Sequence, residues 1–368
     1  MNQGDNMKVL VLVEDYPSEN SHAMMYVHVR NKFYYKKNIN VTVLNFSTNN
    51  DYEYENIKVI SLKTYKEVNE KYDILICHAA NLKHHYCFLT KYEKNFEKIV
   101  FFYHGHEILK ISEVYPPNYK WIKTKNNKFI RDIYDKVKCI LWKRKLNKLL
   151  YKSQLVFVSR WLYDRFLYYI HMNPKNLEKH VSIINNSVGS IFEEKSYNLE
   201  TQKKYDFITI RGNAIDRGEK GIDIVTQLAE SNPSNTFLVV GKGKFYQYNK
   251  KPENLEFLEK QLTHQEMLEY LNKSRCALLP TKQDTQGVMT CEVATYGIPT
   301  ITSDIEVCKE IFSNMKNVKF INNSETNIKL GKILQELEQE LDLDKHERFF
   351  AKNTIQKEVD LFNKQMKT

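Results

Sequence analysis

The chain has 368 residues, of which 42% are apolar and 27% charged, so its composition is that of a globular protein of about two domains rather than a disordered chain. Its 11 Gly and 8 Pro are too few for a linker-rich protein, and its longest apolar runs are too short for a membrane-spanning helix. The six Cys form no Cys-x-x-Cys pair, and no basic secretory start precedes Met7, so we expect reduced thiols and a cytoplasmic location.

Short apolar runs alternate with amphipathic stretches through the first half of the chain. Because the runs do not alternate with polar residues, they indicate strands buried on both faces, with helices between them. The expected strands are Lys8–Val13, Val41–Phe46, Lys58–Ile60, Ile74–Cys77, Lys98–Tyr103, Leu155–Val158 and Val181–Ile184. The expected helices are Ser21–Tyr35, His84–Phe96, a basic helix within 120–152, and Trp161–Tyr169.

The same pattern restarts near Tyr205, after a polar stretch without periodicity. The expected strands are Phe207–Ile210, Phe237–Val240, Cys276–Leu279 and Pro299–Thr302, and the expected helices are Gly221–Glu230, His264–Leu271, Val288–Tyr296 and Glu306–Phe312. We therefore predict two doubly wound α/β domains with parallel sheets, at residues 1–195 and 205–345. A C-terminal helix within 346–368 is expected to pack back toward the first domain. Ligands of such sheets bind at the carboxyl ends of the strands, so we expect the site there.

The positive charge of the chain is concentrated in one segment. Residues 120–152 contain twelve Lys or Arg and only two Asp, a net charge of +10 that equals the net charge of the whole chain. Apolar residues recur there at helical spacing, which predicts a basic amphipathic helix with these residues on one side: Ile130, Ile133, Val137, Ile140, Leu141, Leu146, Leu149 and Leu150. Such a helix is typical of contact with an anionic membrane surface. The alternatives are an ordinary solvated face and, less favoured, nucleic acid.

The most informative segment runs from Leu279 to Asp304. An expected strand ends at Pro280, a polar loop with Asp284 follows, and a helix then begins after Gly287. A glycine at a helix entrance lets backbone N–H groups approach an anion closely, at the positive end of the helix dipole. Glu292, about one turn inside the helix, can accept hydrogen bonds from a vicinal diol. A plain strand–loop–helix with solvated carboxylates is the alternative.

In order and spacing, these residues resemble the donor-site signature of the retaining glycosyltransferases of family 4. The signature is an acidic residue, seven intervening residues, a Glu and then Gly-x-Pro, and here it is Asp284, Glu292 and Gly297-Ile298-Pro299. The resemblance implies the GT-B fold, in which two Rossmann-like domains face a central cleft. It also implies that the nucleotide is bound by Gly287, Val288, Met289 and Glu292. Asp284 departs from the family, which usually has the longer Glu, and would face the donor sugar.

A second match lies in the loop after the expected strand Phe207–Ile210. In the family, an Arg at the strand end and a Lys before a Gly bind the donor diphosphate. Lys220 precedes Gly221 here, and Arg211 is our choice for the Arg, with Arg217 as the competing residue. Cations suit this chemistry, because breaking the sugar–phosphate bond leaves a nucleoside diphosphate with growing negative charge.

In the first half, His104 follows an expected strand, at a place comparable to a family His near the donor sugar and the acceptor. The resemblance implies a catalytic role for His104, and a core or capping His is the alternative. The spacing of His104, His106 and Glu107 offers no preformed metal geometry, and we expect no metal or cofactor. The Gly-rich loop that the family has after its first strand is here Pro17–Ala23, which contains no Gly.

Together these motifs predict a cytoplasmic, metal-independent, retaining hexosyltransferase. Its donor would be a UDP- or GDP-sugar. We expect a glycan or lipid-linked oligosaccharide as the acceptor, in bacterial surface polysaccharide synthesis. The alternatives on the same fold are a nucleotide-sugar epimerase and a glycogen-type synthase. A non-catalytic scaffold that binds nucleic acid or a membrane is the alternative from another class.

Overall fold

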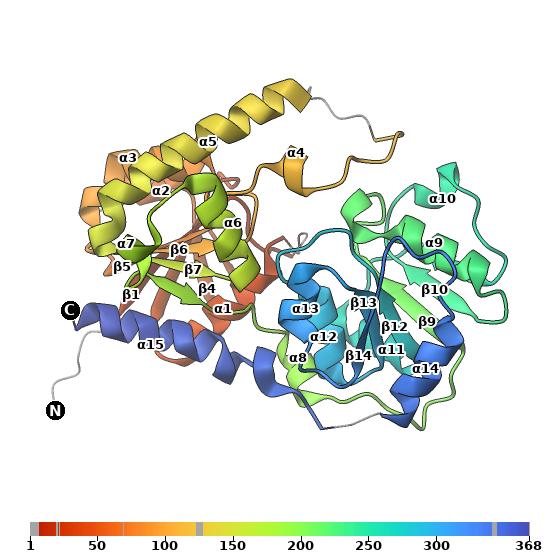
Figure 1. Ribbon diagram of the computed structural model, residues 1–368. Coiled ribbons are helices and arrows are strands. Elements are labelled where there is room, and N and C mark those ends of the chain that lie inside the picture. The colour runs from red at the N-terminus through yellow and green to blue at the C-terminus, as the bar shows by residue number, and fades with distance from the viewer. Residues whose placement is uncertain are drawn as a thin grey trace. The chain divides into compact units, whose positions relative to one another are not determined.

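The computed structural model describes residues 7–19, 21, 23–68, 70–122, 128–340 and 344–367. The chain forms two compact units, each with its own sheet (Figure 1). The first unit is drawn from residues 1–110, 132–187 and 351–368, and the second from residues 111–131 and 188–350. No helix among the described residues is both long enough and apolar enough to span a membrane.

The first sheet has the strand order β3-β4-β2-β1-β5-β6-β7-β8. All neighbouring strands pair in parallel except β3 and β4, which are antiparallel. Residues Val9 to Val13 of the central strand are fully buried, as expected of a strand covered by helices on both faces. The strands are β1 (Lys8–Val13), β2 (Asn40–Asn45), β3 (Tyr52–Tyr54), β4 (Ile57–Ile60), β5 (Ile74–His78), β6 (Lys98–Tyr103), β7 (Ser153–Phe157) and β8 (Val181–Ile183).

Helices cover both faces of this sheet, and neighbouring residues of β6 show the two faces. Phe101 lies against Trp142 of α5, with the ring centroids 6.0 Å apart, whereas Phe102 belongs to the core formed with α1 and α15. The α-helices are α1 (Met25–Lys36), α2 (Leu62–Glu67), α3 (Cys87–Tyr92), α5 (Lys128–Leu149, from Asp132 on in this unit), α6 (Arg160–Ile170), α7 (Pro174–Leu177) and α15 (Ile355–Met366).

The C-terminal helix α15 is part of the first unit. Its Ile355, Val359 and Phe362 are buried in the same core as β1 and α1. Its Glu358 forms a buried ion pair with Arg30 of α1, at 2.9 Å between Oε1 and Nε, and also accepts a hydrogen bond from Tyr34. The last residues of the chain therefore complete the core that the first residues begin.

The second sheet has the order β11-β10-β9-β12-β13-β14, and all its neighbouring strands pair in parallel. Both sheets are thus doubly wound, as the sequence predicts. The strands are β9 (Tyr205–Ile210), β10 (Phe237–Val240), β11 (Leu255–Leu258), β12 (Ser274–Leu279), β13 (Thr300–Ser303) and β14 (Val318–Ile321). The α-helices are α4 (Ile111–Val114), α8 (Ser190–Glu194), α9 (Ile222–Ser231), α10 (Phe245–Tyr248), α11 (His264–Asn272), α12 (Val288–Tyr296), α13 (Glu306–Phe312) and α14 (Leu330–Gln339).

One segment from the first half of the chain, Ile111–Ile122, packs in the second unit, and we call it the strap. Tyr119 of the strap donates a hydrogen bond to Asp223 of α9 at 3.0 Å, and Trp121 stacks on Tyr248 with the ring centroids 5.1 Å apart. A Cβ atom on Gly218 would lie 2.9 Å from the carbonyl oxygen of Pro117, so this close approach requires glycine. The domain boundary drawn from the sequence at residue 195 does not separate out this segment.

Candidate donor site in the second unit

The candidate site lies where the strand order of the second sheet changes direction. Strands β9 and β12 are neighbours, and the chain leaves β9 toward β10 on one side and β12 toward β13 on the other. Their carboxyl ends therefore release two adjacent loops, 211–221 and 280–287, which lead into α9 and α12. Ligands of doubly wound sheets bind at such a switch point. Here the N-termini of α9 and α12, which are the positive ends of the helix dipoles, lie at the ends of the two loops.

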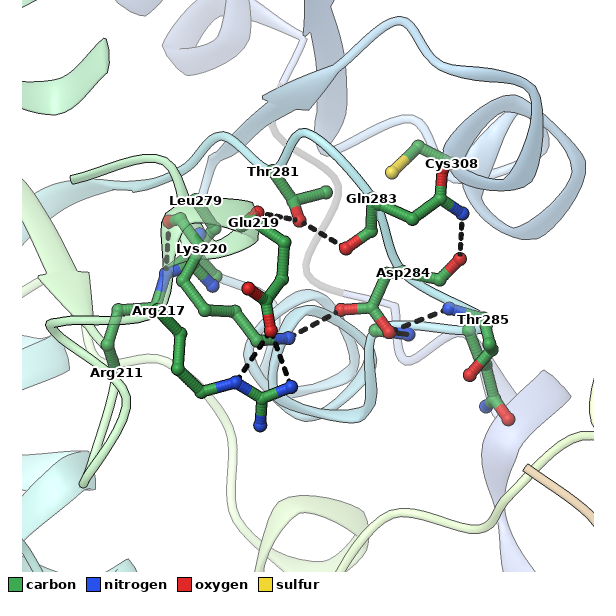
Figure 2. A network of polar contacts seen from close by, with 12 residues as sticks. Arg211, Arg217, Glu219, Lys220, Leu279, Thr281, Gln283, Asp284, Thr285 and Cys308 are labelled. Carbon is green, nitrogen blue, oxygen red and sulfur yellow. Dashed lines mark hydrogen bonds and ion pairs between the residues drawn. The ribbon is translucent and has the colours of Figure 1, made fainter. Parts of the chain in front are cut away.

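An ion pair joins the two loops. Lys220 Nζ lies 2.9 Å from Asp284 Oδ2 (Figure 2). The other carboxylate oxygen, Oδ1, accepts hydrogen bonds from the backbone N–H groups of Thr285 at 2.8 Å and Gly287 at 3.1 Å. Burial raises the pKa of Asp284, but the Lys220 ammonium and these N–H groups outweigh it and lower the pKa to about 2. Asp284 is therefore a fixed negative charge at neutral pH.

Arg211 directly follows β9, and its side chain connects the same two loops. Its Nε donates to the carbonyl oxygen of Lys220 at 3.1 Å, and its terminal nitrogen donates to the carbonyl oxygen of Pro280 at 2.6 Å. Burial lowers the pKa of Arg211 to about 10, so the guanidinium keeps its positive charge at neutral pH. The side chain thus places a buried cation between the loops and holds them together.

Arg217, the competing arginine, is engaged elsewhere. Its Nε donates to Glu219 at 2.6 Å, and its side chain is 52% exposed while that of Glu219 is 7% exposed (Figure 2). The carbonyl oxygen of Glu219 accepts from the backbone N–H of Lys282 and from the Thr281 hydroxyl, each at 2.8 Å. Arg217 therefore neutralises a residue that ties the two loops together, whereas Arg211 lies between the loops itself.

Two glycines allow the loops to approach each other. Gly221 has φ +66°, and a Cβ atom there would lie 2.7 Å from the carbonyl oxygen of Pro280. Gly287 has φ +77° and directly precedes α12, whose first two residues are Val288 and Met289. Side-chain-bearing residues rarely adopt this left-handed backbone, so both positions favour glycine. The helix entrance at 287–289 predicted for the nucleotide is present, next to Asp284.

Glu292 lies one turn inside α12 and is buried, with 7% of the residue exposed. Burial raises its pKa to about 7, although the backbone N–H of Gly189 stabilises the carboxylate. His264, at the start of α11, has its Nε2 3.8 Å from Glu292 Oε1. The spacing of Asp284 and Glu292 thus places one carboxylate against Lys220 and the other beside His264.

His104 belongs to the first unit and follows β6, at the carboxyl edge of that sheet. Its Nε2 lies 3.0 Å from Nδ1 of His78, the last residue of β5, and its ring packs on Tyr26 with the centroids 4.6 Å apart. Glu107 accepts hydrogen bonds from the backbone N–H of His104 at 2.8 Å and of Gly105 at 2.6 Å, which fixes the loop. Burial holds the pKa of His104 well below its usual value, so the imidazole is neutral at pH 7.

The sequence analysis missed four residues that shape these places: Gly189, Glu219, His264 and His78. Glu219 could have been found from the sequence, because it lies two residues from Arg217 in the same loop and carries the opposite charge. The contacts of Gly189 and His264 with Glu292 join residues far apart in sequence and have no local signal. In the loop Pro17–Ala23, Asn20 and His22 lie outside the described residues. Backbone bonds between Ser18 and Ser21, at 3.0 and 3.2 Å, close a turn there.

Comparison with known proteins finds one family that matches part of the chain. Residues 212–337, which contain all the described donor-site residues except Arg211 and Gly189, match the protein family "Glycosyl transferases group 1". No curated protein matches the chain by sequence.

Solved structures share the whole architecture at low sequence identity. Sucrose-phosphate synthase from Thermosynechococcus elongatus is 12% identical with a TM-score of 0.69, and the match covers 98% of this chain and 99% of that one. HepE from Anabaena, in complex with UDP and glucose, is 12% identical with a TM-score of 0.69, covering 98% and 100%. A glycosyltransferase from Rickettsia africae is 11% identical with a TM-score of 0.68, covering 99% and 100%. The fold is therefore GT-B, which confirms the predicted fold class.

Proposed function

We propose that the protein is a retaining glycosyltransferase that binds a nucleoside-diphosphate sugar in its second unit. The observation that carries this proposal is the group of Arg211, Lys220 and Asp284, which joins the carboxyl ends of β9 and β12. The match of residues 212–337 to group 1 glycosyltransferases supports it. A plain structural ion pair would need only Lys220 and Asp284. The buried Arg211 and two helix entrances add positive potential beyond what that carboxylate neutralises.

The two cations have different roles in this proposal. When the donor binds, Lys220 leaves its ion pair with Asp284 and contacts the donor diphosphate instead. There it stabilises the negative charge that grows on the leaving group. Arg211 has two N–H donors committed to carbonyl oxygens, so it acts through its charge and by holding the two loops together. Asp284, once released from Lys220, accepts a hydrogen bond from a hydroxyl of the donor sugar. Gly287, Val288 and Met289 offer their backbone to the nucleotide at the entrance of α12.

Glu292 suits the ribose of the nucleotide. A carboxylate can accept hydrogen bonds from two neighbouring hydroxyl groups, and this one is held by Gly189 beside His264. Its raised pKa means that a partner donating hydrogen bonds is favoured, because such a partner stabilises the charged form that burial disfavours. UDP- and GDP-sugars are the proposed donors. A complex of the structurally similar HepE with UDP and glucose supports this choice.

His104 is proposed to contact the sugar or the acceptor through its ring, as a neutral hydrogen-bonding group. We further propose a lipid-linked oligosaccharide as the acceptor, at the cytoplasmic face of a membrane. No metal is proposed for the reaction, since Lys220 and Arg211 supply the positive charge at the diphosphate.

Thermal-shift screening of UDP-, GDP- and ADP-sugars tests the donor site. A ligand at 100 times its dissociation constant stabilises the folded protein by about 2.7 kcal/mol. Hydrolysis of the stabilising donor should release a sugar with the anomeric configuration of the donor, visible by NMR. Inverted product would refute the retaining mechanism, interconversion of free nucleotide sugars would indicate an epimerase, and no stabilisation by any nucleotide would refute the site.

A further inference from the structure

Helix α5 has two apolar faces rather than the single one that the sequence predicts. One face is buried in the first unit through Cys139, Trp142, Leu146 and Leu149. Because residues of a helix advance by 100° each, Ile133, Val137 and Ile140 lie on the opposite side. Their exposed fractions are 47%, 45% and 52%. We call these three residues the apolar stripe, and Figure 1 shows α5 on the outside of the first unit.

Basic residues lie on the same side of α5 as the apolar stripe. Lys136 and Arg144 are exposed there, and Lys143 is partly exposed. The only acidic residues of the helix, Asp132 and Asp135, are half-buried and buried, and Asp135 forms an ion pair with Lys138 at 2.6 Å. The exposed side of α5 therefore combines isoleucine and valine with positive charge, whereas the two carboxylates of the helix are half-buried or buried.

Other lysines of the basic segment have structural roles in the first unit. Lys145 lies 3.0 Å from Glu93 and Lys148 pairs with the same carboxylate. Lys138 donates to the carbonyl oxygens of His106 at 2.9 Å and Leu109 at 2.8 Å, and Lys152 donates to two more carbonyls. These lysines are explained by the fold, whereas the basic residues beside the apolar stripe are not.

We propose that the apolar stripe inserts into the headgroup region of an anionic lipid surface, with Lys136, Lys143 and Arg144 contacting the lipid phosphates. An interfacial helix of this kind combines apolar burial with attraction to acidic lipids. Charge complementarity decides the occupant, because a second copy of the chain would bring like charges together. The inference deepens the proposed function, and it rests on that function only for the lipid-linked acceptor; the docking itself does not depend on the reaction.

Sedimentation with vesicles tests the docking, using phosphatidylcholine alone and an equal mixture of phosphatidylcholine and phosphatidylglycerol. The wild type should bind the mixed vesicles and be released as salt screens the charges. The triple variant Ile133→Ser, Val137→Ser, Ile140→Ser should lower the partition coefficient by about tenfold or more. A second variant, Lys136→Gln, Lys143→Gln, Arg144→Gln, leaves the apolar stripe intact and should lower the partition coefficient by a similar factor.

The matched control removes three exposed apolar side chains outside α5: Val68→Ser, Leu199→Ser, Met366→Ser. It should bind the mixed vesicles like the wild type. Binding unchanged by the stripe variant, equal binding to both kinds of vesicle, an equal loss in the control, or self-association in solution that the stripe variant abolishes would each overturn the docking. Donor hydrolysis without vesicles should be the same in all variants. If no protein hydrolyses a donor while vesicle binding behaves as expected, the proposed function fails and the docking stands.

Discussion

Replacing Glu292 with Gln should stabilise the ligand-free protein at high pH and have little effect at low pH. Burial raises the pKa of Glu292 from 4.5 to about 7. Below the unfolded value, the folded and unfolded states are both protonated, and the residue costs nothing. Between the two values, only the unfolded state ionises, so the free energy of unfolding falls as pH rises. Above about 7, the folded protein carries a buried carboxylate at a constant cost.

The size of the effect follows from the shift. Each pKa unit corresponds to about 1.4 kcal/mol, so the full cost is about 3 kcal/mol, and most of it appears between pH 5 and pH 8.5. Glutamine keeps an oxygen for the Gly189 N–H and cannot ionise. Glu292→Gln should therefore raise the unfolding temperature at pH 8.5 by about 5–10 °C more than it does at pH 5. The control is Glu253→Gln, an exposed carboxylate in the same unit.

The same variant tests the nucleotide site. UDP affinity of the wild type should fall by about tenfold from pH 8 to pH 6 relative to the variant, since the ribose favours the ionised carboxylate. The phosphate titrates in both proteins and cancels in the ratio. His264→Gln is the control for the neighbouring imidazole, whose Nε2 lies 3.8 Å from Glu292 Oε1, and its UDP affinity is measured at the same pH values. A stabilisation by Glu292→Gln that is equal at both pH values would refute the reasoning.

Further changes separate the residues of the two loops. Lys220→Ala should lower turnover by about 10²-fold, measured as donor hydrolysis, because one group that stabilises the leaving diphosphate is removed; unchanged turnover would move the diphosphate elsewhere. Asp284→Asn should lower turnover more than UDP affinity in calorimetry, because this carboxylate would face the sugar; the reverse order would contradict that role. Arg211→Ala should lower both turnover and the unfolding temperature, since its guanidinium bonds to both loops. Arg217→Ala should change turnover and the unfolding temperature only slightly, because the side chain is half-exposed and its described ion pair is with Glu219. If Arg217→Ala has the large effect and Arg211→Ala the small one, Arg217 and not Arg211 is the arginine of the diphosphate site.

The sequence predicts the interior strands of both sheets well and, apart from β8, misses the edge strands. The bounds of β1, β6 and β10 agree with the expected ranges, because continuous apolar runs are what double burial requires. The strands β3, β11 and β14 were not predicted, and all three lie at sheet edges. Charged residues such as Glu256 and Lys319 interrupt the apolar runs of β11 and β14, which an edge strand tolerates because it is partly exposed. The apolar pattern there is too short to distinguish from a loop.

For the candidate site, local spacing predicts what lies within one strand–loop–helix and nothing that joins two of them. Asp284, Gly287 and Glu292 follow from one stretch of sequence. The contact of Lys220 with Asp284 depends on the pairing of β9 with β12, which no local pattern encodes. Charge counting fails for the same reason in the basic segment, where the shared partner of Lys145 and Lys148 is Glu93, about fifty residues earlier.

The ion pair between Arg30 and Glu358 has a consequence for how the protein is made. The two residues are 328 positions apart. At a synthesis rate of roughly 5–20 residues per second, Arg30 leaves the ribosome about 16–65 seconds before its partner. Through that interval the core beside α1 lacks Ile355, Val359 and Phe362. The first unit therefore reaches its final core only when residues 351–368 are available, so a chain truncated after residue 350 should resist protease in the second unit and be cut in the first.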